Sequence, residues 1–318
     1  DIMPEQFSQE TLTEIFKYLN VDEHGSDDLF NCLLMNRYWC KAAIPVLWSA
    51  PFKYADVLPL DGVIDAYVAC LTKKEREELL GKGTIIDHPI PKRVAFDYIN
   101  YLRDFNYFGL MASLFHWGCS STGVYKINNL YRNMLPAFLR IFARRRIRLK
   151  SLELVNRDGL GVWENEFMHL VRPENRRLIE SVQKLYLDME IVDGNFFTRL
   201  SDVCRNLKSL HIIIHSKCSV KVMQDFKNYF SHILPALVTQ AYSLHRVEFI
   251  KADFTKCESF DGLLFCENLE MLKFTECCNI DKNLLEPLFK VKFKKHAVME
   301  MENMDYNVDA LKKLKKKS

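Results

Sequence analysis

The 318-residue sequence lacks an apolar run long enough to cross a membrane. Its longest apolar stretches, such as AAIPVLW at 42–48 and HIIIH at 211–215, are far shorter than the roughly 20 residues that a bilayer requires. The first residues also lack the charged and then apolar pattern of a secretory signal peptide. We therefore expect a protein of the cytoplasm, the nucleus or both, with no membrane association.

The sequence also lacks the paired cysteines of common metal sites. Its ten cysteines form no C-x-x-C pair, and without a leader they favour reduced thiols. The arrangement closest to a metal site is His211, His215 and Cys218. A strand through this stretch would place the two histidines about 13 Å apart, and no fourth ligand is near. We therefore expect polar residues beside a buried isoleucine strand, and neither a metal nor a cofactor.

Signatures of catalysis and of nucleic-acid binding are missing as well. The sequence contains no Walker loop and none of the motifs G-x-G-x-x-G, H-E-x-x-H or G-x-S-x-G, so we expect no catalytic residues and no enzyme activity. The net charge of +3 is too small to indicate a nucleic-acid partner. Apolar residues interrupt the basic run at 140–150 at helical spacing, which favours a solvated helix face.

Helical periodicity dominates the first half of the chain. Leu12, Ile15, Phe16 and Leu19 share one helical face, and Ser8 is a candidate N-cap. A polar loop follows, and a second helical pattern continues until Pro45 ends or restarts it. Residues 1–52 are thus predicted to form a three-helix cluster, and residues 53–148 a helical linker region.

The pattern changes at residue 149. The motif L-x-x-L-x-L, with Val, Ile or Phe in place of some leucines, starts at residues 149, 182, 207, 244 and 269, and helical patterns lie between the copies. Two of the four intervals fall within the 20 to 29 residues of leucine-rich repeats, and the other two imply insertions. We predict an irregular leucine-rich-repeat arc over 149–290 and a divergent Lys-rich tail over 291–318, hence an α/β fold. An ordinary α/β sheet with chance matches is the alternative.

The opening segment resembles the F-box motif. Met3-Pro4, Ile15 with Leu19, Trp39 and Leu47-Trp48 stand at the positions of that motif's Leu-Pro, Ile-x-x-x-Leu, Trp and closing Leu-Trp. The order of F-box, helical linker and leucine-rich repeats is similar to that of fungal F-box proteins. The resemblance implies a substrate-recognition subunit of a Skp–cullin–F-box ubiquitin ligase, which binds a Skp-type adaptor, and through it a cullin scaffold, and presents a protein substrate for ubiquitin-dependent degradation. A repeat scaffold without a ligase role is the alternative.

Both partners can be assigned candidate residues. We expect Phe16, Leu29 and Trp48 to pack inside the chain, and other large residues of the cluster to contact the adaptor, since exposed apolar patches mark interaction sites. In a repeat arc, the third, fifth and seventh residues of each copy face the partner. The predicted adaptor-binding residues are Pro4, Leu12, Ile15, Leu19, Leu33 and Trp39, and the predicted substrate-binding residues are Glu153, Lys184, Tyr186, His211, Arg246, Glu248 and Lys273.

Overall fold

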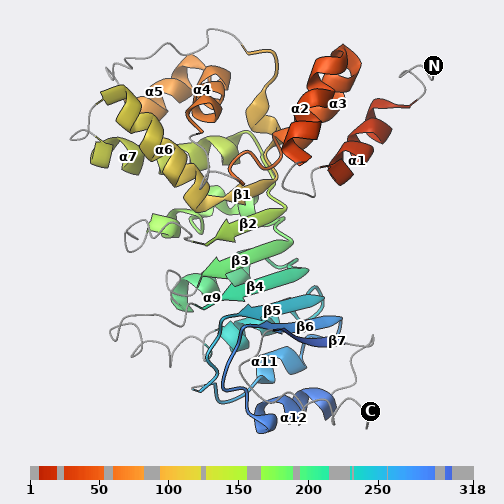
Figure 1. The fold of residues 1–318 in the computed structure, drawn as a ribbon. Coiled ribbons are helices and arrows are strands. Elements are labelled where there is room, and N and C mark those ends of the chain that lie inside the picture. Colours follow the sequence, from red (N-terminus) through yellow and green to blue (C-terminus); the bar gives the residue numbers. More distant parts are fainter. Residues whose placement is uncertain are drawn as a thin grey trace. The chain divides into compact units, whose positions relative to one another are not determined.

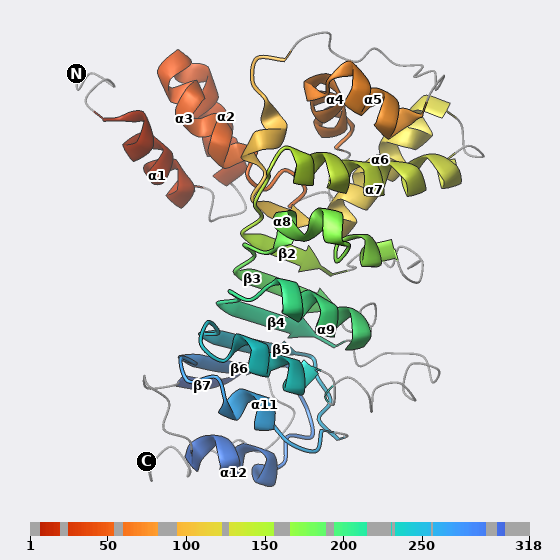
Figure 2. The same cartoon turned by 180° about the vertical axis from the view of Figure 1, so that it is seen from behind.

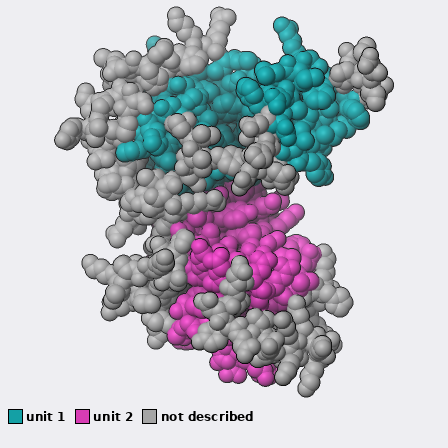
Figure 3. Space-filling model, viewed as in Figure 1, with its two compact units in different colours: residues 1–147 teal, residues 148–318 magenta. Residues whose placement is uncertain are grey.

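The computed structural model divides the chain into two compact units, residues 1–147 and 148–318 (Figure 3). The division lies within two residues of the change in sequence pattern at 149. Each unit is described by itself below. The residues described are 7–19, 25–53, 60–81, 94–122, 127–155, 166–188, 194–214, 230, 233–255, 257–290 and 298–302.

Unit 1 is mostly helical (Figure 1). None of the helices that the structure describes, in either unit, is long and apolar enough to cross a membrane. The elements of unit 1 are α1 (Gln9–Leu19), α2 (Gly25–Met35), α3 (Arg37–Leu47), α4 (Asp61–Cys70), α5 (Lys73–Leu80), the 3-10 turn η2 (Tyr98–Tyr101), the short strand β1 (Asp104–Asn106), α6 (Tyr107–Thr122) and α7 (Ile127–Arg144).

The helices α1 and α3 begin at side chains that cap them. The Thr11 amide donates to Ser8 Oγ at 3.2 Å, as the predicted cap of α1 requires. The second helical segment was predicted to end or restart at Pro45. The break between α2 and α3 lies instead at Asn36, which has an extended backbone. Its Oδ1 accepts from the amides of Tyr38 and Trp39, both at 2.9 Å, so Asn36 caps α3 and is not part of a continuous apolar face.

Pro45 lies inside α3, and a side chain of α1 replaces the backbone hydrogen bond that the proline cannot donate. Proline has no N–H, so the carbonyl of Lys41, four residues earlier, lacks its usual helical donor. Gln9 Nε2 of α1 donates to that carbonyl at 3.2 Å. Thr13 Oγ1, one turn further along α1, donates to the Ala42 carbonyl at 3.2 Å. The proline thus provides an acceptor that holds α1 against α3.

Ion pairs join α5 to the end of α7. Arg140 and Arg144 bind the two carboxylate oxygens of Glu78 at 3.1 and 2.6 Å. Arg145 binds Glu75 at 2.8 Å and Asp97 at 2.9 Å, and its side chain is only 15% exposed. The solvated face predicted for this basic run is therefore wrong for Arg145, which Glu75 and Asp97 enclose, whereas Arg144 pairs with Glu78 and keeps 51% of its side chain exposed.

Unit 2 combines helices and strands, and its strands β2 to β7 form a parallel sheet in sequence order. The predicted α/β class is confirmed in this form. The elements are β2 (Ser151–Leu154), η3 (Glu166–His169), η4 (Pro173–Asn175), α8 (Arg176–Ile179), β3 (Lys184–Asp188), α9 (Gly194–Val203), β4 (Ser209–Ile213), η6 (Leu237–Gln240), β5 (Arg246–Ile250), α11 (Asp261–Leu264), β6 (Met271–Thr275), α12 (Lys282–Lys290) and β7 (Val298–Glu302).

The register of the sheet follows the sequence motif. Each strand from β2 to β6 begins at the third residue of one L-x-x-L-x-L copy, and equivalent positions pair from strand to strand. A seventh strand, β7, pairs with β6 in the same register, so the sheet continues into the segment predicted to be a divergent tail. The predicted start of the tail, after residue 290, is therefore too early. The strand was missed because residues 298–302 do not contain a recognisable copy of the repeat motif. Residues 303–318 lie outside the described part of the chain.

The motif leucines form the core of unit 2. Side chains alternate between the two sheet faces, so the fourth and sixth motif residues point to one side. Figure 2 shows α8, α9 and α11 on one side of the sheet. Leu152, Leu185, Leu210 and Val247 form one fully buried row across the strands. Residues between them on the other face are more accessible, and these include the predicted substrate-binding positions.

Candidate functional site

Large apolar side chains are exposed on α1 and α2. Tyr18 is 81% exposed, Leu34 is 70% exposed and Ile15 is 42% exposed. Such side chains cost free energy in contact with water, and monomeric proteins seldom gather them on neighbouring helices. We call this set the helical apolar surface, and it consists of Ile15, Tyr18, Phe30, Leu34 and Met35.

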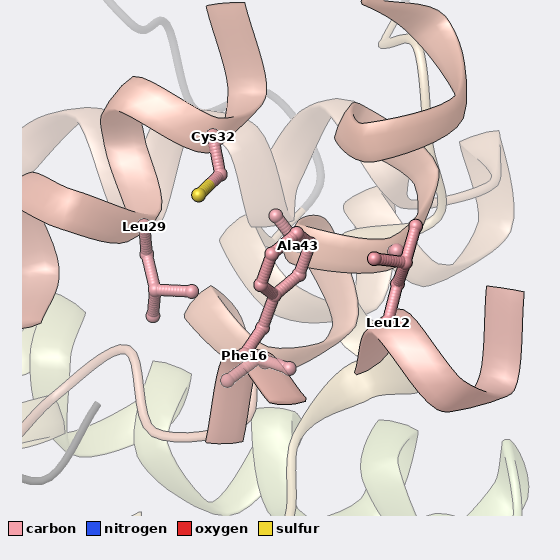
Figure 4. Close-up of a cluster of buried hydrophobic side chains, with 7 residues drawn as sticks. Leu12, Phe16, Leu29, Cys32 and Ala43 are labelled. Atoms are coloured by element: carbon pink, nitrogen blue, oxygen red, sulfur yellow. The ribbon is translucent and has the colours of Figure 1, made fainter. Parts of the chain in front are cut away.

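Other large residues fill the core beneath this surface. Figure 4 shows Leu12 and Phe16 of α1 beside Leu29 and Cys32 of α2 and Ala43 of α3. Leu12 is only 3% exposed, so its predicted contact with an adaptor is corrected here to a core position. Phe16 and Leu29 are buried, as predicted. The cluster is therefore packed internally without using the exposed residues of α1 and α2.

The remaining predicted adaptor residues differ in exposure. Ile15 is exposed, whereas Leu19, Leu33 and Trp39 are half-buried against the core cluster. The Trp39 ring lies 5.4 Å from the Phe16 ring, so it has a structural role whatever else it contacts. Pro4 lies outside the described residues.

Four exposed residues escaped the sequence prediction. Tyr18, Phe30, Leu34 and Met35 do not belong to the stripe that faces the core. The sequence does contain a sign of these exposed residues. LFNCLLM at 29–35 places apolar residues all around a helix, and the core of a three-helix cluster covers only one side of such a helix.

The second surface is the accessible face of the sheet in unit 2. Adjacent strands place Tyr186, His211, Glu248 and Lys273 in one row at the fifth motif position. The rings of Tyr186 and His211 stack with centroids 4.3 Å apart and an interplanar angle of 11°. His211 Nδ1 lies 2.9 Å from Glu248 Oε2. The predicted positions are thus brought together, and they also contact one another directly.

Glu248 is the centre of this polar row. Its carboxylate accepts from Thr275 Oγ1 at 3.1 Å and from the Arg246 guanidinium at 3.2 Å, and Lys273 Nζ lies 3.7 Å away. Burial alone would raise the pKa of Glu248, but the charges and hydrogen bonds of His211, Thr275 and Arg246 outweigh burial and lower it. Glu248 is therefore ionised at neutral pH although it is only 8% exposed.

His211 is held in one tautomer. An ionised Glu248 can only accept, so Nδ1 carries the proton, and Nε2 accepts from Ser209 Oγ at 2.8 Å. Burial lowers the pKa of His211, and nearby Arg246 and Lys184 add to this effect against the opposing charge of Glu248. The imidazole is therefore neutral at pH 7, and it fixes the two side chains on either side of it.

The hydrogen-bonded order Ser209, His211, Glu248 is also that of a hydrolytic triad, but the amides of β4 beside Ser209 are not available to an oxyanion. Such a site needs preorganised donors for the oxyanion. The β4 amides beside Ser209 donate within the sheet, and the Ser209 amide itself binds the Gln183 carbonyl at 3.0 Å. The row is therefore a hydrogen-bonded and stacked network on the accessible face of the sheet.

The other three predicted substrate residues, Glu153, Lys184 and Arg246, lie beside this row. Glu153 of β2 pairs in register with Tyr186, and Lys184 is exposed at the start of β3. His211 is only 8% exposed, so it supports the face more than it contacts a partner. Lys184, Arg246 and Tyr186 are the predicted residues that a partner can reach most directly.

The metal arrangement considered from the sequence is only partly described. His211 belongs to the polar row, while His215 and Cys218 lie outside the described residues. Within the described ranges, no group of three or more His, Cys, Asp or Glu residues could hold a metal ion, and no disulfide joins the eight cysteines whose side chains are described. Comparison with models of known protein families finds no match for this chain, and a search of curated proteins finds no significant relative.

Proposed function

We propose that the chain is a non-catalytic substrate-recognition subunit of a Skp–cullin–F-box ubiquitin ligase. The observation that carries this proposal is the helical apolar surface, which lies on a three-helix cluster whose core is already filled by other residues. Exposed apolar side chains over a completed core favour a protein partner. The resemblance of the same segment to the F-box motif identifies that partner as a Skp-type adaptor.

In this role the leucine-rich-repeat-like sheet of unit 2 binds the protein substrate. Its accessible face offers an aromatic ring at Tyr186 and charged groups at Lys184 and Arg246, which is typical of protein-binding surfaces. The chain supplies no reacting group. It accelerates ubiquitin transfer by holding the substrate near a thioester carried by another protein of the complex, which is catalysis by proximity. Both partners would be met in the cytoplasm or nucleus.

A repeat scaffold without a ligase role remains the second candidate. The same sheet face would serve either protein, so unit 2 does not distinguish them. The distinction lies in α1 and α2, because only the ligase subunit requires an adaptor to cover the helical apolar surface.

The experiment co-expresses the full chain with a Skp-type adaptor and measures co-purification. The test variant carries Ile15→Asp and Leu34→Asp, which place charges in the helical apolar surface without removing a core residue. Interface anchors of this kind are each worth about 2 kcal/mol, so adaptor binding should weaken more than tenfold. Trp39→Ala is less suitable because it removes a ring that packs on Phe16.

The matched control is Lys41→Asp, an exposed position on α3 of the same cluster. It should bind the adaptor as the wild type does, and all three proteins should share one thermal unfolding midpoint within a few degrees. Failure of the wild type to bind would refute the ligase proposal. Undiminished binding by the double variant would show that the adaptor contacts a different surface.

A further inference from the structure

Charges on the sheet of unit 2 are segregated along the strands. The second and third motif residues of the first four copies include four cations and no carboxylate. Further along strands β2, β3 and β5, the fifth and seventh positions contribute the carboxylates of Glu153, Asp188 and Glu248 and no cation. We call the first set the basic edge, and it consists of Lys150, Lys184, Lys208 and Arg246.

The four cations are neighbours at one edge of the sheet. The Lys184 amide donates to the Lys150 carbonyl at 3.0 Å, and the Arg246 amide donates to the Lys208 carbonyl at 2.9 Å. The Lys208 amide binds the Gln183 carbonyl at 2.7 Å, which links the two pairs. Since parallel strands lie about 4.8 Å apart, the basic edge extends over about 15 Å.

The cations are accessible, whereas the carboxylates are largely buried. Lys150, Lys184 and Lys208 are exposed, and none of them forms an ion pair with a described residue. Arg246 is half-buried and forms an ion pair with Glu248. Asp188 is only 1% exposed. A partner that approaches the starts of these strands therefore meets three lysines that form no ion pair with a described residue.

The length of the basic edge limits what it can bind. At the next strand the cation is replaced by Glu270 and Met271, so the row ends after four strands. A phosphate backbone longer than the basic edge would place phosphates near the carboxylate of Glu270 or, if it followed the strands, near that of Glu153. A short cluster of carboxylates on an extended protein segment matches both the length and the sign of the edge.

We propose that the basic edge docks an acidic segment of the partner protein, laid across the starts of β2 to β5. The inference rests on the protein-binding role of unit 2 within the proposed function, and it specifies the class of substrate. The partner's carboxylates pair with Lys150, Lys184 and Lys208, and the buried Glu248 keeps the neighbouring Arg246 in place.

Fluorescence anisotropy with the full chain tests the proposal. The probe is a labelled peptide of about twelve residues with alternating glutamate and serine, and an RNA oligonucleotide of equal length is the second probe. The test variant is Lys150→Glu with Lys184→Glu and Lys208→Glu. The control is Lys73→Glu with Lys74→Glu and Lys282→Glu, which changes the net charge equally at exposed positions of α5 and α12.

We expect the test variant to bind the peptide at least about tenfold more weakly than the wild type, and the control to differ less than about twofold. The wild-type affinity should also fall as salt is added. Equal losses in both variants, no peptide binding by the wild type, or tighter binding of the RNA would each overturn the proposal.

Adaptor co-purification with the test variant separates this inference from the ligase proposal. The variant should capture the adaptor as the wild type does, because its changes lie outside α1 and α2. Peptide binding by a wild type that captures no adaptor would refute the ligase role and leave the basic edge supported. Adaptor capture without peptide binding would do the reverse.

Discussion

Glu75 connects two parts of unit 1 through a single carboxylate. Its side chain and Thr72 form a capping box at the start of α5. The same carboxylate binds Arg145 in a bidentate manner, at 3.0 and 2.8 Å. Hydrogen bonding to Arg145 is the main cause that lowers the pKa of Glu75, to about 2, and Thr72 contributes to it. Protonation of this one residue therefore weakens a helix cap and an ion pair together.

The variant Glu75→Gln should make unit 1 less sensitive to acid. The folded pKa lies below the ordinary value near 4.5, so the ionised carboxylate stabilises the fold above pH 4.5 and this stabilisation is lost as the pH falls toward about 2. At pH 7 the substitution should cost about 1 kcal/mol of unfolding free energy. Thermal unfolding of both proteins from pH 7 to pH 2 measures this. The two curves should converge toward low pH, and curves that stay parallel would contradict the assignment.

At the scale of elements, α11 depends on the absence of a side chain. A Cβ on Gly262 would lie 1.7 Å from the carbonyl oxygen of Leu234 and 2.4 Å from its carbonyl carbon. Backbone atoms cannot rotate away as a side chain can, so α11 could keep its place only if one of the two segments moved.

The variant Gly262→Ala should therefore destabilise unit 2 by about 3 kcal/mol. Gly62→Ala in α4 is the control, because nothing lies within 4 Å of its Cβ position, and alanine there should be neutral or stabilising by up to about 1 kcal/mol. Chemical denaturation of both variants gives the two free energies. Equal stability of the two variants would show that α11 does not pack on Leu234 as described.

Sequence patterns predicted some elements better than others, for physical reasons. The register of β2 to β6 was predictable because each motif leucine must face the core, which fixes every residue between them. The helix break at Asn36 was missed because it depends on a cap, in which Asn36 Oδ1 accepts from the start of α3. Hydrophobic periodicity does not reveal such a cap. The pairing of Arg145 with Glu75 joins residues that are far apart in the sequence, so no local pattern could predict it.

The candidate sites show the same limits. The sequence correctly placed Tyr186, His211 and Glu248 on one face, but their hydrogen-bonded row depends on neighbouring strands and became visible only in the structure. On α2, the prediction considered only the residues that face the core, so it did not include the exposed Phe30 and Leu34. Phe30 and Leu34 lie at i, i+4 spacing, as core residues of a helix also do, so spacing alone does not show which apolar face is covered.

At the scale of the whole molecule, the two units carry different kinds of surface. Unit 1 exposes apolar side chains on α1 and α2, and unit 2 exposes a charged and aromatic sheet face. In the proposed function the first binds the adaptor and the second binds the substrate. Each can then be altered by mutation without loss of the other, as the separate variants at Ile15 and Lys184 are designed to show.

Hydrogen–deuterium exchange of the full chain, with and without a Skp-type adaptor, tests the central claim most directly. Covering the helical apolar surface should slow amide exchange in Gln9–Leu19 and Gly25–Met35. Exchange in strands β2 to β6 should stay unchanged, because the proposed adaptor contacts lie on α1 and α2. Protection confined to α1 and α2 is the predicted result. Unchanged exchange in both helices, or protection confined to the sheet, would contradict the account.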